Sequence, residues 1–231
     1  MCYTNYVHKN LENLLSPKSI AVIGASATPE KVGAIVIDNI IASKFTGHIY
    51  PINPKQQAIK GLKCYPTITS LPEIVDLAVI AIPAASVNAI LNEIGLKGIK
   101  NVIVFSAGYK EIGAEGKVLE DEMDQIALKY GLNLLGPNCL GFVNNTSPVN
   151  VTFGEPVYNQ GELRFVSQSG ALAASLFDFC NATGLGFSEF ITLGNKSVVN
   201  ENDVLAYFLN KDRNANGIVH PIGLYLESIA N

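Results

Sequence analysis

The chain has 231 residues, of which 48% are hydrophobic and only 16% are charged, and its net charge is −4 at pH 7. An average globular chain carries about 25% charged residues, and strands covered on both faces explain so apolar a composition. The acidic balance and the lack of any basic run of five residues argue against general nucleic-acid binding, which needs a basic surface.

Short apolar runs alternate with amphipathic segments from Ser16 onward. The runs predict strands at 19–24, 48–54, 76–83 and 101–108, and a short fifth strand with a turn at 132–144. Helices are predicted between them at 32–43, 84–98 and 115–131, and the segment 64–73 is predicted to be a loop with one short turn. Repeated β-α-β units predict a parallel, doubly wound sheet.

A second set of alternating elements follows a stretch with no periodicity. Its predicted strands are 162–167, 187–194 and 222–228, and its predicted helices are 171–183 and 202–212. We therefore expect two tandem α/β units. The domain prediction is an N-terminal segment at 1–15, a first domain at 16–145, a linker at 146–161 and an incomplete second domain at 162–231.

The N-terminal residues lack a basic segment followed by an apolar one, so we expect no secretory signal. The most apolar stretch, 76–91, is broken by proline and polar residues and is too short to span a bilayer. Four scattered cysteines without a C-x-x-C pair are typical of reduced thiols and indicate no metal site; they are Cys2, Cys64, Cys139 and Cys180. A cytoplasmic protein is the prediction.

The segment VIGASATPEKVG, 22–33, joins the first predicted strand to the first helix, where parallel sheets bind ligands. Gly24 permits a tight turn, Ser26 offers a hydroxyl, and Ala25 and Ala27 leave the backbone accessible. Helix N-terminal amides there favour a phosphate group. The dinucleotide pattern G-x-G-x-x-G is incomplete, because Ser26 stands at the second glycine position. A tight turn with no ligand is the alternative.

The second strand ends in Asn53-Pro54-Lys55 rather than in the Asp or Glu that binds a ribose hydroxyl. A positive charge there suits a phosphate-bearing ribose, which is found in NADP and in coenzyme A with its 3′-phosphate. Ile82-Pro83-Ala84 and Ser106-Ala107-Gly108 place small or apolar residues at the same edge, which suits a long thin ligand. Pro83 also fits a simple helix start.

The segment FVSQSGALAAS, 165–175, opens the second unit in a similar way and is suited to hold an anion. It is not a hydrolase nucleophile elbow, because the pattern G-x-S-x-G needs glycine where Ser167 stands. Cys139 follows Pro-Asn and suggests either a nucleophile or a structural, thiol-lining residue. No histidine pairs with it in the sequence pattern, which favours the second interpretation.

Taken together, these motifs resemble the CoA-binding (alpha) part of the NDP-forming acyl-CoA synthetases, the superfamily of succinyl-CoA synthetase and ADP-forming acetyl-CoA synthetase. The matching stretches are SIAVIGASATPEKVG, YPINPK, DLAVIAIPA, FSAGYKEIG, LLGPNCLG, FVSQSGALAAS, ITLGNKSVVNENDVLAYF and IGLYLESI. NPK and SQSGALA favour the acetyl-CoA synthetase branch. The resemblance implies a Rossmann-like CoA-binding domain followed by a partial flavodoxin-like, succinyl-CoA synthetase-like doubly wound domain.

The resemblance also implies a reaction in which acid, CoA and ATP are interconverted with acyl-CoA, ADP and phosphate. An acyl phosphate passes its phosphoryl group to a histidine, which carries it to an ATP-grasp domain or beta subunit that holds the nucleotide and Mg²⁺. The ligands implied are coenzyme A and a small carboxylic acid, and the assembly implied is an oligomer.

The family's functional residues carry over by motif. Coenzyme A is assigned to Gly24, Ala25, Ser26, Ala27, Asn53, Pro54, Lys55, Ile82, Pro83, Ala84, Ser106, Ala107, Gly108, Asn138 and Cys139. The phosphoryl group is assigned to Ser167, Gln168, Ser169, Gly170 and Ala171. Glu227 is implied to orient the phosphohistidine, because a carboxylate on one imidazole nitrogen fixes the tautomer and leaves the other nitrogen to attack.

The family's histidine motif is not found, and His8, His48 and His220 are interpreted as surface or strand-edge residues. We therefore expect an incomplete subunit that binds CoA and does not turn over alone. Two other functions stay open at this point. One is a CoA-binding regulatory module of a protein acetyltransferase-type fusion, and the other is an NADP-dependent oxidoreductase.

Overall fold

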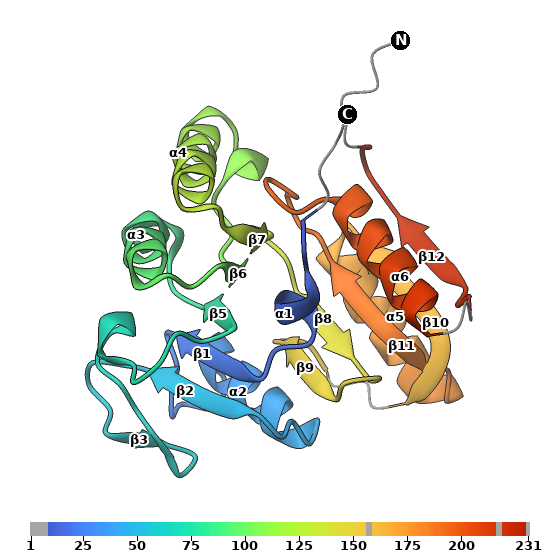
Figure 1. The fold of residues 1–231 in the computed structure, drawn as a ribbon, viewed down its shortest axis with the longest axis horizontal. Helices are drawn as coiled ribbons and strands as arrows, with labels where there is room; N and C mark the ends of the chain where they lie inside the picture. Colours follow the sequence, from blue (N-terminus) through green and yellow to red (C-terminus); the bar gives the residue numbers. More distant parts are fainter. Residues whose placement is uncertain (1–8, 156–158, 216–218, 230–231) are drawn as a thin grey trace.

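A computed structural model describes residues 9–155, 159–215 and 219–229, and shows two five-stranded sheets side by side (Figure 1). The first sheet is parallel throughout, with the order β2-β1-β5-β6-β7. Its strands are β1 (Ser19–Ile23), β2 (His48–Ile52), β5 (Leu77–Ile80), β6 (Asn101–Val104) and β7 (Asn133–Leu135). The predicted parallel sheet is confirmed.

Helices cover both faces of this first sheet (Figure 1). One face carries α3 (Val87–Lys97) and α4 (Ala114–Tyr130), and the other carries α1 (Glu12–Leu15) and α2 (Val32–Ala42). Side chains alternate along β1, so that Ala21 packs toward α3 while Ile20 packs toward α2. Burial on both faces explains the continuous apolar runs and the low share of charged residues.

Several short elements connect these strands and helices. The predicted loop at 64–73 contains one 3₁₀ turn, η1 (Ile68–Ser70), as expected. Two further 3₁₀ turns, η2 (Ala84–Ser86) and η3 (Lys110–Ile112), follow strands β5 and β6. A small hairpin precedes η1 and is formed by β3 (Ala58–Ile59) and β4 (Leu62–Lys63). Strands of two residues each leave no readable period in a sequence, so this hairpin was not predicted.

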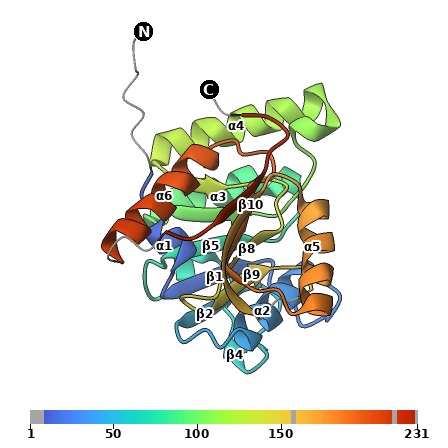
Figure 2. The same cartoon turned by 90° about the vertical axis from the view of Figure 1, so that its right-hand side faces the viewer.

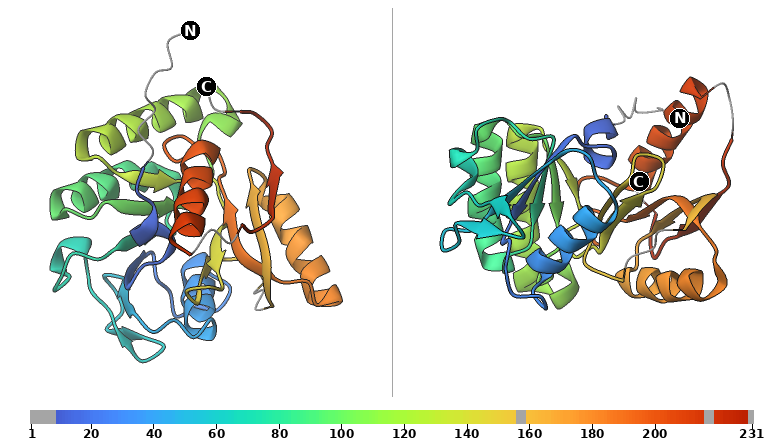
Figure 3. Two further views of the ribbon diagram at one scale, coloured as in Figure 1. Left: turned by 45° about the vertical axis from the view of Figure 1, so that its right-hand side comes forward. Right: turned by 90° about the horizontal axis from the view of Figure 1, so that it is seen from below.

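The second sheet is mixed and has the order β12-β10-β11-β8-β9. Its strands are β8 (Gly141–Asn144), β9 (Val149–Thr152), β10 (Gln160–Ser167), β11 (Phe187–Thr192) and β12 (Ile222–Tyr225). The last three are mutually parallel, whereas β8 runs antiparallel to both β11 and β9. Helices α5 (Gly170–Thr183) and α6 (Glu201–Asn214) cover opposite faces (Figure 3).

The β8–β9 hairpin corrects two predictions. The stretch 132–144 holds two strands in different sheets, and the predicted linker at 146–161 contains strand β9. Asn144 Oδ1 accepts hydrogen bonds from the backbone amides of Thr146 (3.0 Å) and Ser147 (3.0 Å), which closes the turn. The valines of β9 are buried, so a four-residue strand is hidden among turn-forming residues. Residues 156–158 of the predicted linker lie outside the described residues.

One apolar core joins the two sheets. It contains side chains of α2, of the β8–β9 hairpin, of β10 and β11, and of α6. Figure 2 shows β9 beside α2. Asn39 Nδ2 of that helix donates to the carbonyl oxygens of Thr152 (2.9 Å) and Gly154 (3.0 Å). Because buried polar groups need partners, these bonds fix how the hairpin sits on α2.

A buried ion-pair network holds α6 to the second sheet. Arg164 is 2% exposed, and its guanidinium contacts Glu189 Oε2 (2.9 Å) and Asp212 Oδ1 (2.7 Å). Glu189 Oε1 also accepts hydrogen bonds from Lys211 Nζ (2.8 Å) and Tyr207 Oη (3.0 Å). Burial alone raises the pKa of Asp212. The hydrogen bonds from a histidine and from Arg164 outweigh that effect and lower the pKa.

Removing Arg164 from this network should destabilise the protein. Arg164→Met leaves Glu189 and Asp212 buried without their main cation, so we expect a loss of about 3 kcal/mol or more in the free energy of unfolding. Urea unfolding followed by circular dichroism measures it. The control is Arg213→Met, one residue beyond Asp212 and exposed, which should change stability by about 0.5 kcal/mol or less. Equal stability of the two variants would contradict the prediction.

Candidate functional site

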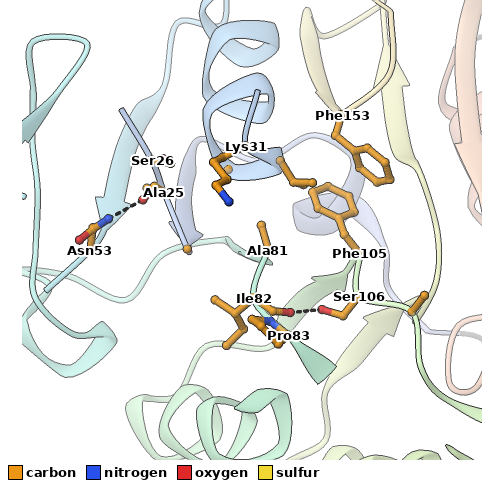
Figure 4. Close-up of a pocket in the computed structure, with 14 residues that line it drawn as sticks. Ala25, Ser26, Lys31, Asn53, Ala81, Ile82, Pro83, Phe105, Ser106 and Phe153 are labelled. Carbon is orange, nitrogen blue, oxygen red and sulfur yellow. Dashed lines mark hydrogen bonds between the residues drawn. The ribbon is translucent and has the colours of Figure 1, made fainter. Parts of the chain in front are cut away.

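A cavity of about 520 Å³ opens at the carboxyl ends of β1, β5 and β6, the edge at which open α/β sheets bind ligands (Figure 4). Eight of the residues predicted to bind coenzyme A line it. They are Gly24, Ala25, Ser26, Asn53, Ile82, Pro83, Ser106 and Ala107. The sequence prediction had placed these residues at one edge, and the structure brings them together there.

The turn after β1 requires glycine. Gly24 has φ +85°, and a Cβ atom on it would lie 2.4 Å from the carbonyl oxygen of Ala81. The turn is fixed by the residue that follows β2: Asn53 Nδ2 donates to the carbonyl oxygen of Ala25 (2.7 Å; Figure 4). Ser106 Oγ similarly donates to the carbonyl oxygen of Ile82. These two side chains therefore hold the strand ends in place.

Lys31 is a cation at this cavity that sequence reasoning missed. It is the residue before α2, it is exposed, and Figure 4 shows its side chain extending into the cavity. Lys55, by contrast, is exposed but is not among the lining residues, and its backbone amide donates to Asn53 Oδ1 (2.8 Å). The available signal for Lys31 was its place one residue before the helix, where a phosphate also meets the helix N-terminus.

A second cavity of about 590 Å³ adjoins the first. Phe105 and Phe153 line both cavities, and their rings meet edge to face with centroids 5.1 Å apart. Seven predicted residues line the second cavity, which lies between the two sheets. They are Asn138, Cys139, Gln168, Ser169, Gly170, Ala171 and Glu227.

The SQSG turn begins α5 at the second cavity. Ser169 is the N-cap residue, and its Oγ accepts a hydrogen bond from the amide of Leu172 (3.2 Å). Ser167 is fully buried and does not line the cavity. Its Oγ donates to the carbonyl oxygen of Ser169 (2.8 Å), so its hydroxyl proton serves the turn itself. Of the two serines assigned to the phosphoryl group from the sequence, Ser169 lines the cavity and Ser167 does not.

A charged cluster closes the other side of the second cavity. Lys110 Nζ contacts Glu120 Oε1 (3.0 Å) and donates to the carbonyl oxygen of Asn195 (2.7 Å). Asn195 Nδ2 donates to Glu120 Oε2 (2.8 Å) and to Glu111 Oε2 (2.7 Å). Burial alone raises the pKa of Glu111. Its hydrogen bonds from Asn195 and from backbone amides outweigh that effect and hold the pKa below its ordinary value. None of these residues was predicted as a site residue. The contacts of Asn195 cross between the two units, which a single sequence does not display.

Asn195 follows a glycine that permits a close approach between the two units. Gly194 has φ +56°, and a Cβ atom there would lie 2.2 Å from the carbonyl oxygen of Pro137. The Asn195 amide donates to that same carbonyl oxygen (2.9 Å). The GPNC loop of the first unit and the loop after β11 are therefore held against each other at the cavity.

Cys139 lines the second cavity but is only 2% exposed. Burial raises the pKa of its thiol to about 12. Its Sγ lies 3.6 Å from the carbonyl oxygen of Val104, its hydrogen-bond acceptor. A thiol that stays protonated is a poor nucleophile, which supports the structural, thiol-lining interpretation.

The two described histidines lie away from both cavities. His48 is at the start of β2, beside Tyr50 and Glu73. His220 Nδ1 lies 3.2 Å from Asp212 Oδ1, within the ion-pair network of α6. His8 lies outside the described residues.

Some predicted residues do not line either cavity. They are Ala27, Pro54, Lys55, Ala84, Gly108 and Ser167. Residues that line a cavity but were not predicted include Lys31, Phe105, Lys110, Phe153 and Asn195. Most of the additional residues follow from packing between distant segments, which a single sequence does not display.

Among residues 9–155, 159–215 and 219–229, no group of three or more His, Cys, Asp or Glu side chains is arranged to hold a metal ion. In the same part of the chain, no helix has the length and apolar character needed to cross a lipid bilayer.

This fold, with a glycine turn and two adjoining cavities at the strand ends, is that of a ligand-binding α/β protein. Residues 18–145 match the CoA binding domain family, and residues 160–231 match the succinyl-CoA ligase like flavodoxin domain. The first match covers more than half of the chain, and the protein belongs to the CoA binding domain family.

Relatives place the chain more narrowly. It is 41% identical over 219 residues to the acetate–CoA ligase [ADP-forming] I of Archaeoglobus fulgidus, covering 95% of this chain and 31% of that protein. It is 39% identical over 224 residues to the acetate–CoA ligase [ADP-forming] I subunit alpha of Pyrococcus furiosus, covering 95% of this chain and 47% of that subunit. The chain thus spans about a third to a half of the length of these relatives.

A solved structure shows the same fold. It is the dinucleotide forming acetyl-coenzyme A synthetase 1 of Ca. Korarchaeum cryptofilum in complex with phosphate and ADP, with a TM-score of 0.88 and 38% identity. The match covers 96% of this chain and 46% of that one. The predicted resemblance to the CoA-binding (alpha) part of NDP-forming acyl-CoA synthetases is confirmed.

The buried thiol gives a direct test of the site chemistry. With a pKa of about 12, roughly one Cys139 side chain in ten thousand is a thiolate at pH 8, so iodoacetamide should leave it unmodified in the folded protein. Peptide mass spectrometry after timed alkylation measures this. In urea the same residue should react at the rate of an ordinary cysteine, which is the control. Rapid alkylation in the folded state would contradict the assignment.

Proposed function

We propose that the chain is the CoA-binding portion of an ADP-forming acyl-CoA synthetase. The reaction is acid + CoA + ATP = acyl-CoA + ADP + phosphate. In the acyl-CoA-consuming direction, a phosphate oxygen attacks the thioester carbonyl and CoA leaves as the thiol, which gives an acyl phosphate. A histidine nitrogen then takes the phosphoryl group and releases the carboxylic acid. The observation that carries the proposal is the pair of adjoining cavities, one suited to a nucleotide and one to a phosphoryl group.

Coenzyme A is placed in the first cavity. The turn at Gly24 leaves the backbone open at the N-terminus of α2, which has no side-chain cap, and amides there favour phosphate. Lys31 adds a positive charge inside the cavity. The volume of about 520 Å³ lies within the range of small-molecule sites. Phe105 and Phe153 line both cavities, so we place the thiol end of coenzyme A beside Asn138 and Cys139 in the second cavity.

The phosphoryl group is placed at the start of α5. Ser169 Oγ accepts a hydrogen bond from the backbone amide of Leu172, and the carbonyl oxygen of Ser169 accepts one from the backbone amide of Ala173. The backbone amides of Gly170 and Ala171, in the first turn of α5, are therefore proposed to bind the phosphoryl group. A helix N-terminus stabilises negative charge. Glu227 lines the same cavity, where a carboxylate orients an incoming imidazole.

The remaining parts of the reaction are assigned to a partner. We place ATP or ADP, with Mg²⁺, on an ATP-grasp domain or beta subunit, as the family reaction requires. The Archaeoglobus and Pyrococcus relatives are ADP-forming ligases, and the Korarchaeum structure holds phosphate and ADP, which supports this division. Neither His48 nor His220 lines the second cavity, so neither is the phosphoryl acceptor in this proposal.

The ligase function is favoured over the two alternatives. The relatives are acid–CoA ligases that align over nearly the whole of this chain. The relatives described above are named as ligases or synthetases, which favours the ligase function over an NADP oxidoreductase. A regulatory module shares the first cavity but has no need of the second. Calorimetric titration with CoA and with NADP separates the ligase function from the oxidoreductase, and binding of NADP without CoA would overturn the proposal.

The two lysines should differ in their effect on CoA binding. Lys31→Ala removes the cation inside the cavity, so we expect the Kd for CoA to rise about tenfold or more, as for the loss of a charged hydrogen bond. Dephospho-CoA should lose a similar factor if Lys31 contacts the diphosphate. Calorimetry measures both. Lys60→Ala, which removes an exposed lysine beyond β3, is the matched control and should bind CoA like the wild type.

Lys55→Ala tests the assignment made from the sequence. If Lys55 contacts the 3′-phosphate, its loss weakens CoA more than dephospho-CoA, which lacks that phosphate. We expect a selective effect of this kind. Equal losses for the two ligands would show that Lys55 does not contact the 3′-phosphate, and the same calorimetric titrations decide the matter.

A further inference from the structure

Beyond β12 the chain leaves the sheet and runs along the second cavity. The last rung of the β10–β12 pairing is the hydrogen bond from the Gln168 amide to the carbonyl oxygen of Tyr225 (2.8 Å). Strand β12 ends at Tyr225, and Glu227 then lines the cavity. Regular strand pairing therefore stops two residues before the carboxylate that the proposed function needs.

The side chain of Gln168 takes over where the strand pairing stops. Its Oε1 accepts hydrogen bonds from the backbone amides of Glu227 (3.0 Å) and Ser228 (3.2 Å). Its Nε2 donates to Ser228 Oγ (3.5 Å). One amide side chain thus satisfies two consecutive backbone donors, which ties their positions to the SQSG turn.

A second hold comes from the loop after β11. Lys196 Nζ donates to the carbonyl oxygen of Ser228 and contacts Glu201 Oε2 (3.0 Å). The side chains of Lys196 and Glu201 are 8% and 3% exposed, so this ion pair is held away from water. Lys196 itself has φ +45°, a conformation that is uncommon outside glycine. Ser228 is therefore held by its amide and by its carbonyl from two different loops.

We propose that Gln168 is a positioning residue for Glu227, with Lys196 as the second hold. Gln168 belongs to the turn that is assigned to the phosphoryl group, but its side chain is turned to the segment after β12. A shift of the turn when an anion binds is passed through this side chain to the backbone of Glu227. The inference rests on the proposed function for the identity of the anion and for the role of Glu227.

The hydrogen bonds are tested by amide hydrogen exchange on the full 231-residue chain, read by NMR. In Gln168→Ala, the amides of Glu227 and Ser228 should exchange about tenfold faster, because each loses its acceptor. Gln168→Glu keeps an acceptor oxygen and should restore slow exchange. The matched control is Gln57→Ala, an exposed glutamine before β3. The amide of Val166, inside β10, reports any general loss of stability.

The coupling is tested by titrating inorganic phosphate into the same samples. In the wild type, the amide signals of Gly170 and Ala171 should shift together with those of Glu227 and Ser228. In Gln168→Ala, the first pair should still shift and the second pair should not.

The outcomes separate the inference from the proposed function. If exchange at Glu227 and Ser228 is unchanged in Gln168→Ala, or accelerates no more than at Val166, the inference is overturned. If all four amides still shift with phosphate in that variant, it is also overturned. If phosphate shifts none of them in the wild type while the exchange effect holds, the phosphate site fails and the positioning contact stands.

Discussion

The apolar core shared by the two sheets is the constraint on which the site depends. Residues of α2, of the β8–β9 hairpin and of α6 pack into one cluster, so the two units cannot turn freely relative to each other. As a result, the carboxyl ends of β6 and of β10 and β11 face a common cavity. Two separate domains on a flexible linker would leave each strand end open to water. Here the packing assembles one site from both units.

Polar contacts between the two units fix their relative orientation more narrowly than apolar packing does. Lys110, Glu111 and Glu120 come from the first unit and meet Asn195 of the second. Apolar packing alone is tolerant of small rotations, whereas a buried amide with two carboxylate acceptors is satisfied in only one arrangement. The lowered pKa of Glu111 indicates that its charge is stabilised there. The cluster therefore fixes the width of the second cavity as well as one of its walls.

Much of this arrangement could be predicted from the sequence, for physical reasons that differ between segments. Strands such as β1 are continuous apolar runs ended by a glycine, and a parallel sheet follows from their alternation with helices. The hairpin strand β9 was not predicted, because four residues between turns are too few to show the alternation of a strand. Lys31 was not predicted as a cavity residue, because the sequence does not show in which direction a side chain points. Phe153 and Asn195 were not predicted as cavity residues, because the residues that they contact lie far away in the sequence.

At the SQSG turn, backbone and side chains have different roles. The hydroxyl of Ser167 is used inside the turn, and Ser169 Oγ caps the helix. Gln168 reaches back to the segment that carries Glu227. All three side chains thus hold the shape of the turn, and in the proposed function the backbone amides of Gly170 and Ala171 bind the phosphoryl group. Dipoles that are already oriented need no reorganisation when a charged group binds, so a phosphoryl group placed there, as proposed, would be stabilised at little cost.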